Sequence, residues 1–265
     1  MLKISREQMA KMSAGILITF KTQLKEHIRS YFPVQSEHLD DANLLVFIDE
    51  AIETANYFAI SEQAAIQSFI DHTVLLGRNF HQNPLYAELC LPLYDKDISD
   101  NIHRLDTLYD NTWAYLDIVR GKDASHLFLA VSRLKSWLES AKALGYNSLN
   151  IHEIINAFNL VFPEKYKAHS EKVHIDFIRE AVSRAIEDNF LQPASQLSYV
   201  LMAFIAGLNF YHDQLIIGAL KKDTQALSVE HDQSARYEML LNAANNYLSK
   251  IITSARALAT EQKKD

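Results

Sequence analysis

Apolar side chains recur at three- and four-residue steps along most of the chain, which is the spacing of one face of an α-helix. The first stripe follows the capping box Ser5-x-x-Gln8 and ends at Pro33, because proline disfavours helix at the residue before it. Its members are Met9, Met12, Ile16, Phe20, Leu24, Ile28 and Phe32. Strand-like alternation is missing from the sequence, so the pattern predicts an all-α protein of nine or ten helices.

The same spacing predicts the remaining helices. A second runs from Leu44 to Phe58, and Ser61 is expected to cap a third that ends near Gly77. A fourth is expected from about Ser99 to Val119 with Ile102 facing inward, and Asp123 is expected to cap a fifth that ends at Leu144. The later helices are predicted at about 147–162, 170–188, 193–210 with a possible extension to 220, and 228–258.

The chain also matches itself when it is shifted by 130 positions. Phe32-Pro33 then falls on Phe162-Pro163, and Gly77-x-Asn79-Phe80 falls on Gly207-x-Asn209-Phe210. Other identities at this shift pair Gly15, Phe47, Ile48, Glu50, Ala51 and Ala55 with Gly145, Phe177, Ile178, Glu180, Ala181 and Ala185. A shift of 132 pairs Arg104 with Arg236. We therefore predict two tandem homologous helical bundles, residues 1–121 and residues 122–265, packed end to end or side by side.

The repeated Gly-x-Asn-Phe follows an apolar helix in each half. Glycine there is typical of a C-terminal turn or of a helix crossing too tight for a side chain. Because Asn and Phe follow in both halves, we favour a turn in which the asparagine bonds the backbone and the phenylalanine enters the core.

Charge and cysteine content narrow the classes of partner. The chain has 33 acidic and 26 basic residues, a formal net charge of −7, and its bases are scattered. Nucleic acid requires a contiguous basic face, so it is not expected as a partner, whereas an acidic surface suits a basic protein. Cys90 is the only cysteine and can form no internal disulfide. The first residues lack the apolar core of a signal peptide, so a cytoplasmic location is expected.

One segment lacks charge altogether. Between Asp188 and Asp213 there is no Asp, Glu, Lys or Arg, and 197–210 is strongly apolar. A membrane-spanning helix needs about 20 such residues. We therefore expect a central buried helix and no membrane span.

Candidate chemistry is sparse. A di-metal helical bundle needs two Glu-x-x-His units, and the chain offers Glu171-x-x-His174. Cys90 lies among leucines and is expected to be a small buried hydrophobe. We predict a non-enzymatic protein with no metal and no cofactor, and a metal-dependent helical enzyme using Glu171 and His174 remains an alternative.

The irregular stretch 81–100 is the best candidate for a protein-binding surface, because it combines tyrosines with acids. The second half has a similar group directly after its Gly-x-Asn-Phe, so the two connections are predicted to flank one groove. An alternative is that the leucines of 85–93 fold this stretch onto the bundle as a lid. The candidate partner-binding residues are Tyr86, Tyr94, Asp95, Asp97, Tyr211, His212 and Asp213.

Residues 1–120 resemble a family of small helical bacterial proteins encoded beside type VI secretion spike and toxin genes. The resemblance rests on Ile4, Arg6 and Gln8-Met9, Phe32-Pro33, Ala55-x-Tyr57-Phe58-x-Ile60-Ser61-Glu62, Phe69-Ile70-Asp71, Leu76-Gly77-x-x-Phe80-x-x-Asn83-Pro84, and Arg104-Leu105-Asp106-x-Leu108-Tyr109. The second half departs from the family pattern, since no Asn-Pro follows its Gly-x-Asn-Phe.

This resemblance implies a protein partner, either a secreted toxin or a secretion component. It implies an adaptor or chaperone for the toxin, with an immunity protein that neutralises the toxin as the alternative. A helical scaffold unconnected with toxins is a further alternative. The oligomeric state stays open.

Overall fold

The structure is a computed structural model. It describes the backbone of residues 6–37, 39–95, 97–98, 100–121, 124–144, 148–216 and 232–261, and side-chain surroundings in these ranges from residue 15, except at 141–144 and 254–261. Every regular element in these ranges is helical and none is a strand, which confirms the predicted all-α class.

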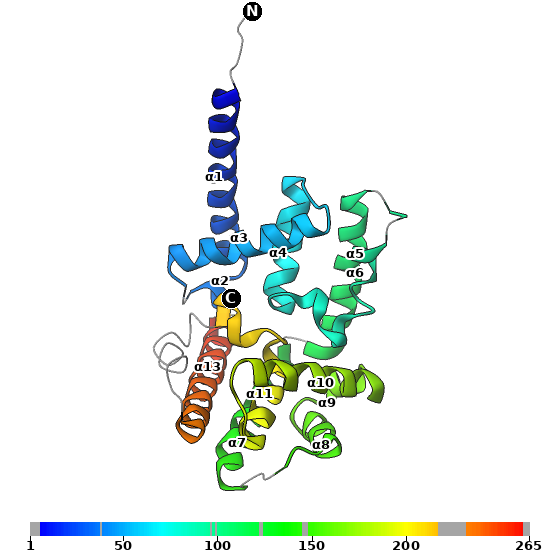
Figure 1. Cartoon of the computed structure of the whole chain (residues 1–265), viewed down its shortest axis with the longest axis vertical. Coiled ribbons are helices and arrows are strands. Elements are labelled where there is room, and N and C mark those ends of the chain that lie inside the picture. The colour runs from blue at the N-terminus through cyan, green and yellow to red at the C-terminus, as the bar shows by residue number, and fades with distance from the viewer. Residues whose placement is uncertain are drawn as a thin grey trace, which may run out of the picture.

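The first half begins with a long helix that extends away from the rest of the molecule (Figure 1). This helix, α1 (Arg6–Tyr31), ends where Pro33 was predicted to stop it, and Phe32 caps the next short helix. The helices that come next are α2 (Pro33–Ser36), α3 (Asp41–Tyr57) and α4 (Gln63–Leu76). The predicted stripe on α3 is its buried face, made of Leu44, Phe47, Ile48, Ala51 and Ala55.

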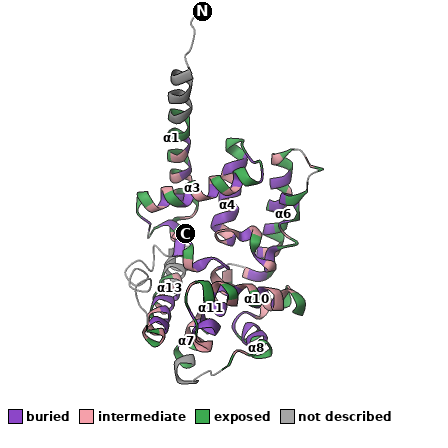
Figure 2. Cartoon of the chain, in the orientation of Figure 1, coloured by how far each residue is buried: buried purple, intermediate pink, exposed green. Residues whose placement is uncertain are grey.

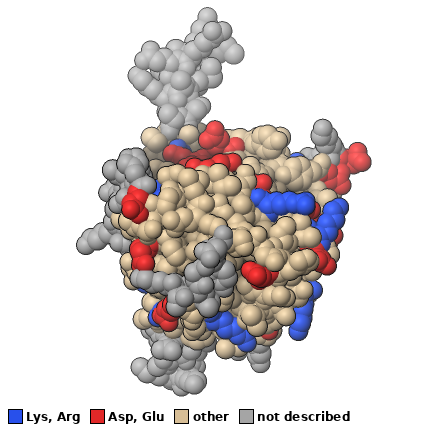
Figure 3. Space-filling model, turned by 60° about the horizontal axis from the view of Figure 1, so that its bottom comes forward, with Lys and Arg blue, Asp and Glu red and all other residues tan. Residues whose placement is uncertain are grey.

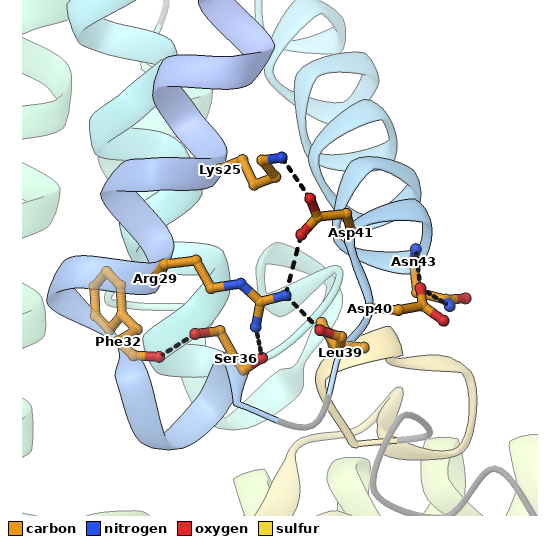
Figure 4. Close-up of polar contacts among 8 residues, drawn as sticks. All are labelled: Lys25, Arg29, Phe32, Ser36, Leu39, Asp40, Asp41 and Asn43. Carbon is orange, nitrogen blue, oxygen red and sulfur yellow. Dashed lines mark hydrogen bonds and ion pairs between the residues drawn. The ribbon is translucent and has the colours of Figure 1, made fainter.

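Arg29 of α1 holds the connection between α2 and α3 (Figure 4). Its guanidinium donates to the backbone carbonyls of Ser36 and Leu39 and lies 3.5 Å from an Asp41 carboxylate oxygen. Lys25, one turn earlier, lies 2.6 Å from the other oxygen of Asp41. Asp40 caps α3 by accepting from the Asn43 amide at 2.9 Å. These contacts fix the angle between α1 and α3. They also provide donors for the Ser36 and Leu39 carbonyls, which accept no hydrogen bond within a helix.

After α4 the chain crosses the bundle in short 3₁₀ and α turns. These are η1 (Phe80–Gln82), η2 (Pro84–Tyr86) and α5 (Leu91–Tyr94), followed by the long helix α6 (Asn101–Arg120). Arg104 of α6 is buried and donates to the carbonyls of Phe58, Pro92 and Leu93 at 3.3, 3.3 and 2.7 Å. It therefore ties the ends of α3 and α5 to α6.

The second half is a bundle of similar helices. They are α7 (Ser125–Leu144), α8 (Ile151–Val161), α9 (Pro163–Lys167), α10 (Glu171–Glu187), α11 (Pro193–Ala206), η4 (Phe210–His212) and α13 (Gln233–Glu261). α7 packs along α13 and also contacts α11 and α8. Residues 195–204 of α11 are all buried, so this segment is the central buried helix that its lack of charge predicts.

The bounds of α10, α11 and η4 are those of α3, α4 and η1 with 130 added. Local details agree as well. Ala59 and Asn189, which follow α3 and α10 at equivalent positions, have φ angles of 58° and 62°. Asn83 and Asp213 each accept a backbone amide two residues on, at 3.0 and 2.9 Å. Arg236 donates to the carbonyl of Asp188 at 2.6 Å, 130 positions after the Phe58 carbonyl that Arg104 binds.

The two Gly-x-Asn-Phe turns meet at the junction between the halves. A Cβ on Gly207 would lie 3.3 Å from the carbonyl oxygen of Leu76 and 3.7 Å from the Cα of Gly77. Asp213 accepts from the Arg78 amide at 2.9 Å, and Asn209 donates to the Arg78 carbonyl at 3.0 Å. The glycine turns are confirmed, but the predicted bond from the asparagine to the backbone occurs only at Asn209, which reaches the other half, whereas Asn79 makes no side-chain cap. The close helix crossing that was the alternative is present at Gly207.

Buried side chains from both halves form one hydrophobic cluster. Figure 2 shows that the buried segments lie where the helices face one another. Phe80 and Phe210, which follow the two glycines by three residues, are 2% and 1% exposed. Each phenylalanine therefore enters the core, as the motif predicts.

Several local predictions are wrong. Glu62, not Ser61, precedes α4, and its carboxylate accepts from the Ser61 amide and from Asn101. Ile102 is 53% exposed. α11 ends at Ala206 because Gly207 turns the chain, and α8 begins at Ile151 because Asn150 caps it.

The described part of the chain holds more helices than nine or ten, since α2, α5 and α9 are single turns. Asp123, Gly145, Leu220 and Ser228 lie outside the described residues.

Candidate functional site

A cleft of about 480 Å³ opens on the first half between α3, α4 and the turn after α4. Buried aromatic rings of Phe47, Phe69 and Phe80 line its floor. Its other lining residues are Glu50, Ala51, Glu53, Thr54, Tyr57, Thr73, Arg78, Asn79, His81, Gln82 and Tyr94. The cleft is thus aromatic below and polar above, which is the composition of a specific recognition site.

Local structure explains how these side chains converge. Glu50, Thr54 and Tyr57 lie three to four residues apart and therefore share one face of α3. Gly77 ends α4 with φ 93° and Asn79 is left-handed with φ 53°, so the chain reverses and returns His81 and Gln82 towards α3. The Tyr94 hydroxyl donates to the His81 carbonyl at 3.3 Å and fixes α5 at the rim.

Glu50 is the acidic group at the inner end of the cleft. One carboxylate oxygen lies 3.1 Å from the Arg78 guanidinium, whereas the buried second oxygen, Oε2, has no hydrogen-bond partner among the described residues. Burial raises the pKa of Glu50, and Arg78 opposes this rise. An unpaired carboxylate oxygen is costly when it is buried, because it has lost its hydration and has no donor in its place.

His81 provides a second unpaired atom, since its buried Nδ1 also has no partner in the described part of the chain. Burial lowers the pKa of His81 and favours the neutral ring. Its ring packs edge-on against Phe58, which also packs edge-on against Tyr94. A neutral imidazole in this position can donate or accept one hydrogen bond without adding charge to the cleft.

Larger side chains stand at the equivalent positions of the second half. Arg184 replaces Thr54 and bonds to Asn209 and, at 3.3 Å, to Gln82. Tyr211 replaces His81 and packs against Phe190 and Tyr199. The residues at positions 184 and 211 are therefore bulkier than Thr54 and His81, which line the cleft in the first half.

The structure separates the predicted partner-binding residues. Tyr94 lines the cleft, and Asp95 and Asp97 are exposed beyond it. Tyr86 and Asp213 are 5% and 2% exposed, so a partner cannot reach either without disrupting the core. This corrects their assignment as contact residues: Tyr86 packs beside Lys165, and Asp213 accepts amides at the junction.

His212 and Tyr211 lie near the junction instead. His212 is exposed and its ring lies 2.6 Å from Asp188, while Tyr211 is half-buried. The His212 carbonyl accepts from the Arg78 guanidinium at 2.8 Å. The two connections therefore touch through Arg78, but only the first of them lines the cleft.

The α3 residues of the cleft are the ones that sequence reasoning missed. In the sequence analysis Glu50 enters only as an identity with Glu180 and Tyr57 only within the family resemblance, while Glu53 and Thr54 are assigned no role. The available signal was an acidic pair at 50 and 53 on a helix that precedes the Gly-Arg-Asn-Phe turn. Its significance depends on the turn bringing Arg78 to Glu50, which no spacing in the sequence specifies.

The residues considered for metal chemistry lie elsewhere. No group of three or more His, Cys, Asp or Glu that could hold a metal occurs among the described residues. His174 is buried and its Nε2 lies 2.9 Å from the Tyr166 carbonyl, while Glu171 is exposed in the first turn of α10. Cys90 is fully buried, and burial raises the pKa of its thiol to about 12.

Charges of both signs share the molecular surface. On the face shown in Figure 3, Lys and Arg side chains alternate with Asp and Glu around a broad uncharged area. None of the helices within the described ranges has the length and apolar character needed to cross a membrane.

Comparison with known proteins does not assign this protein to a class. No protein-family model, no curated protein and no solved structure matches the chain. The class of protein is therefore defined by the all-α fold and by the cleft on its first half.

Proposed function

We propose that this protein is a non-enzymatic protein-binding module whose cleft receives a basic side chain, lysine or arginine, of a partner polypeptide. The observation that carries the proposal is the Glu50 carboxylate, which lines an aromatic cleft and pairs with Arg78 through one of its two oxygens. A cationic donor in the cleft would add a charge-assisted hydrogen bond to this carboxylate.

The surroundings favour a cation over an anion. Glu50 and Glu53 carry two negative charges, and Arg78 carries the one positive charge among the lining residues, because the pKa of His81 is lowered. The Arg78 guanidinium is already engaged by Glu50 and by the His212 carbonyl. Tyr57 and Tyr94 are 78% and 52% exposed at the rim, where their rings can cover the methylene groups and the charge of a bound side chain.

We also propose that the two halves are diverged copies of one helical unit, of which the first kept an open cleft. Support comes from the helix bounds that differ by 130 and from the paired glycine turns. In this interpretation Arg184 and Tyr211 closed the second cleft. The chain then presents one binding cleft on a duplicated scaffold.

The resemblance of residues 1–120 suggests the biological setting. We propose an adaptor or chaperone that grips a segment of a secreted toxin, with an immunity protein as the alternative. A cleft of about 480 Å³ can hold an anchoring side chain of a bound segment, and an adaptor that grips and releases a segment needs such an anchor pocket. Co-expression with a toxin encoded beside the gene separates the two roles: loss of secretion with unchanged growth supports an adaptor, and rescue of growth supports immunity.

The cleft itself can be tested with defined probes. N-acetyl-arginine amide and N-acetyl-lysine amide are titrated into labelled protein, with N-acetyl-glutamine amide as the neutral control, and amide chemical shifts are followed. We expect saturable shifts at residues 79–82 and around Glu50, with dissociation constants of about 1–10 mM, as a single anchored side chain would give. The neutral probe should cause much smaller shifts.

Matched variants make this test specific. Glu50→Gln should weaken binding of both cationic probes about tenfold or more, because it removes the charge that the cation pairs with. Glu180→Gln changes the equivalent residue of the second half, which is paired with Arg184, and should leave binding unchanged. Equal binding by Glu50→Gln and the parent protein, or shifts spread over the whole surface, would rule out this cleft.

A further inference from the structure

The apolar face of α1 continues beyond the body of the molecule. Phe20, Leu24 and Ile28 on this face are buried against the first half. Ile16 belongs to the same stripe but is 59% exposed, and Leu17 and Ile18 beside it are 44% and 66% exposed. Figure 1 shows this end of α1 extending away from the other helices. Ile16 lies one turn before Phe20 on the same helix face, so the apolar stripe of α1 extends past the residues that the first half buries.

A second apolar surface lies on α6. Ile102, Tyr109 and Trp113 are 53%, 51% and 38% exposed, and their spacing of seven and four residues places them on one helix face. The Tyr109 and Trp113 rings pack edge-on with centroids 5.9 Å apart. Three exposed acids flank them on the same helix: Asp106, Asp110 and Asp117. The surface thus has an aromatic centre and an acidic border.

The second half indicates what kind of element covers such a surface. At the shift of 132 that aligns Arg104 with Arg236, Tyr109 aligns with Leu241 of α13. Leu241 is only 4% exposed, and α7 packs along α13. The position equivalent to Tyr109 is therefore covered in the second half, where α7 is one of the two helices that pack on α13 and α11 is the other.

The counterpart of α7 is the first part of α1. At the 130-residue shift, residues 136–144 of α7 align with residues 6–14 of α1, and Gly145 aligns with Gly15. In the second half α7 and α8 are separate helices, whereas α1 is one continuous helix from Arg6 to Tyr31. The segment that corresponds to α7 is therefore carried away from its own α6.

From these contacts we infer that the projecting part of α1 packs on the α6 surface of a second copy of this chain, and that the exchange is reciprocal. Each helix would take the place on its partner that α7 takes on α13. Ile16 and its neighbours would meet Tyr109 and Trp113.

The geometry of α1 favours packing on the α6 surface of a second copy over packing on α6 of the same chain. The 13 residues from Arg6 to Ile18 extend about 20 Å at 1.5 Å per residue, in the direction that the packed part of the helix sets. To reach its own α6 the segment would have to break near Gly15. Exchange of an equivalent element between copies avoids that break and closes a two-fold dimer. The inference uses the two-copy organisation proposed above as its template but not the binding cleft.

Sedimentation equilibrium over 1–100 µM protein is the first test. We expect the parent protein, of 30.3 kDa, to approach twice that mass. Ile16→Glu and Trp113→Glu change exposed side chains on the two surfaces, so each should stay folded and weaken dimerisation at least tenfold. Leu160→Glu is the matched control, because Leu160 is 68% exposed on α8, and it should dimerise like the parent. A parent that remains monomeric at 100 µM would overturn the inference.

Cysteine pairing identifies the occupant of the α6 surface. Ile16→Cys and Tyr109→Cys proteins are mixed and oxidised, and Cys90 is buried and so does not compete. We expect a disulfide between one chain of each kind. Cross-linking of Ile16→Cys with itself would show that two α1 helices pair. A double-cysteine chain that cross-links only within itself would show that α1 folds back. Either result contradicts the exchange.

Discussion

Lys165 of α9 is an amine without a described acidic partner in the core. It is 3% exposed, and its Nζ donates to the Phe204 carbonyl at 2.7 Å and to the Tyr86 hydroxyl at 3.3 Å. The rings of Tyr86 and Phe204 lie 5.4 and 5.2 Å from the nitrogen. Burial lowers the pKa of Lys165 to about 7, since the charged form loses its hydration. Tyr86 belongs to the first half, so this contact joins the halves.

The lowered pKa makes stability depend on pH in a definite direction. Between about pH 7 and 10.5 the unfolded chain keeps its proton on Lys165 and the folded chain loses it, so stability rises with pH. We expect the difference in unfolding free energy between the parent and Lys165→Met to grow in favour of the parent by about 2 kcal/mol from pH 7 to 9. Urea unfolding of both proteins at each pH measures it. A pH-independent difference would show that Lys165 has an ordinary pKa.

At the scale of single residues, the sequence predicted the chemical character of a side chain better than its position in the fold. Cys90 was expected to be buried and is. Tyr86 and Tyr94 were treated alike because both are tyrosines in an irregular stretch, yet one is in the core and the other at the cleft rim. Nothing in the sequence indicated that Lys165 would be buried, since a lysine in a short helix is normally solvated. Burial of a particular polar residue depends on which distant helix packs over it, and local sequence does not encode that.

Among the elements, the C-terminal turns of α4 and α11 are the most constrained. Gly77 has φ 93° and ψ 162°, and Gly207 has φ 102° and ψ 151°, a region open almost only to glycine. Each glycine also lies against the other's helix end, so a side chain would meet backbone atoms. A side chain at either position would therefore destabilise the junction between the halves.

Gly207→Ala should lower the free energy of unfolding by about 1–3 kcal/mol, and Gly77→Ala should act in the same direction. Gly15→Ala is the control, because no atom lies within 4 Å of a Cβ at Gly15 and alanine favours helix. It should leave stability unchanged or raise it by up to about 1 kcal/mol. Denaturant unfolding gives all three values. If Gly207→Ala were as stable as Gly15→Ala, the crossing would not be tight.

Helix existence was largely predictable because it depends on local periodicity. Pro33 marks a predicted stop and Ser170 a predicted start, each for a local reason. The cap of α4 was mistaken because Ser61 competes with Glu62, whose side chain is held by Asn101 from a distant helix. Single turns such as α2 and α9 were missed because four or five residues carry no periodic signal.

At the scale of the whole molecule, the 130-residue shift anticipated which helices have matching bounds but not how the halves join. The junction depends on side chains that differ between them. Arg78 aligns with Leu208, and its amide, carbonyl and guanidinium bond Asp213, Asn209 and His212. The cleft likewise depends on differences, Thr54 against Arg184 and His81 against Tyr211. The matches at the 130-residue shift identify residues that the two halves have in common, whereas the candidate site depends on residues that differ between them.

The shared core and junction lead to a prediction about cooperativity. Trp113 of α6 and Trp137 of α7 are the two tryptophans, so Trp113→Phe and Trp137→Phe each leave one fluorescent reporter, in the second and the first half respectively. Because one hydrophobic cluster spans both halves and buried polar contacts join them, the halves should unfold together.

We expect the urea midpoints from the two reporters to agree within about 0.2 M, and each to coincide with loss of helical circular dichroism in the same variant. The native spectra of both variants and the parent should overlay, which controls for local damage by the substitutions. Two separated midpoints, each matching only part of the dichroism change, would mean that residues 1–121 and 122–265 fold as independent domains. Coincident midpoints would mean that the two halves form one cooperative unit, so that a destabilising change at the cleft also destabilises the second half.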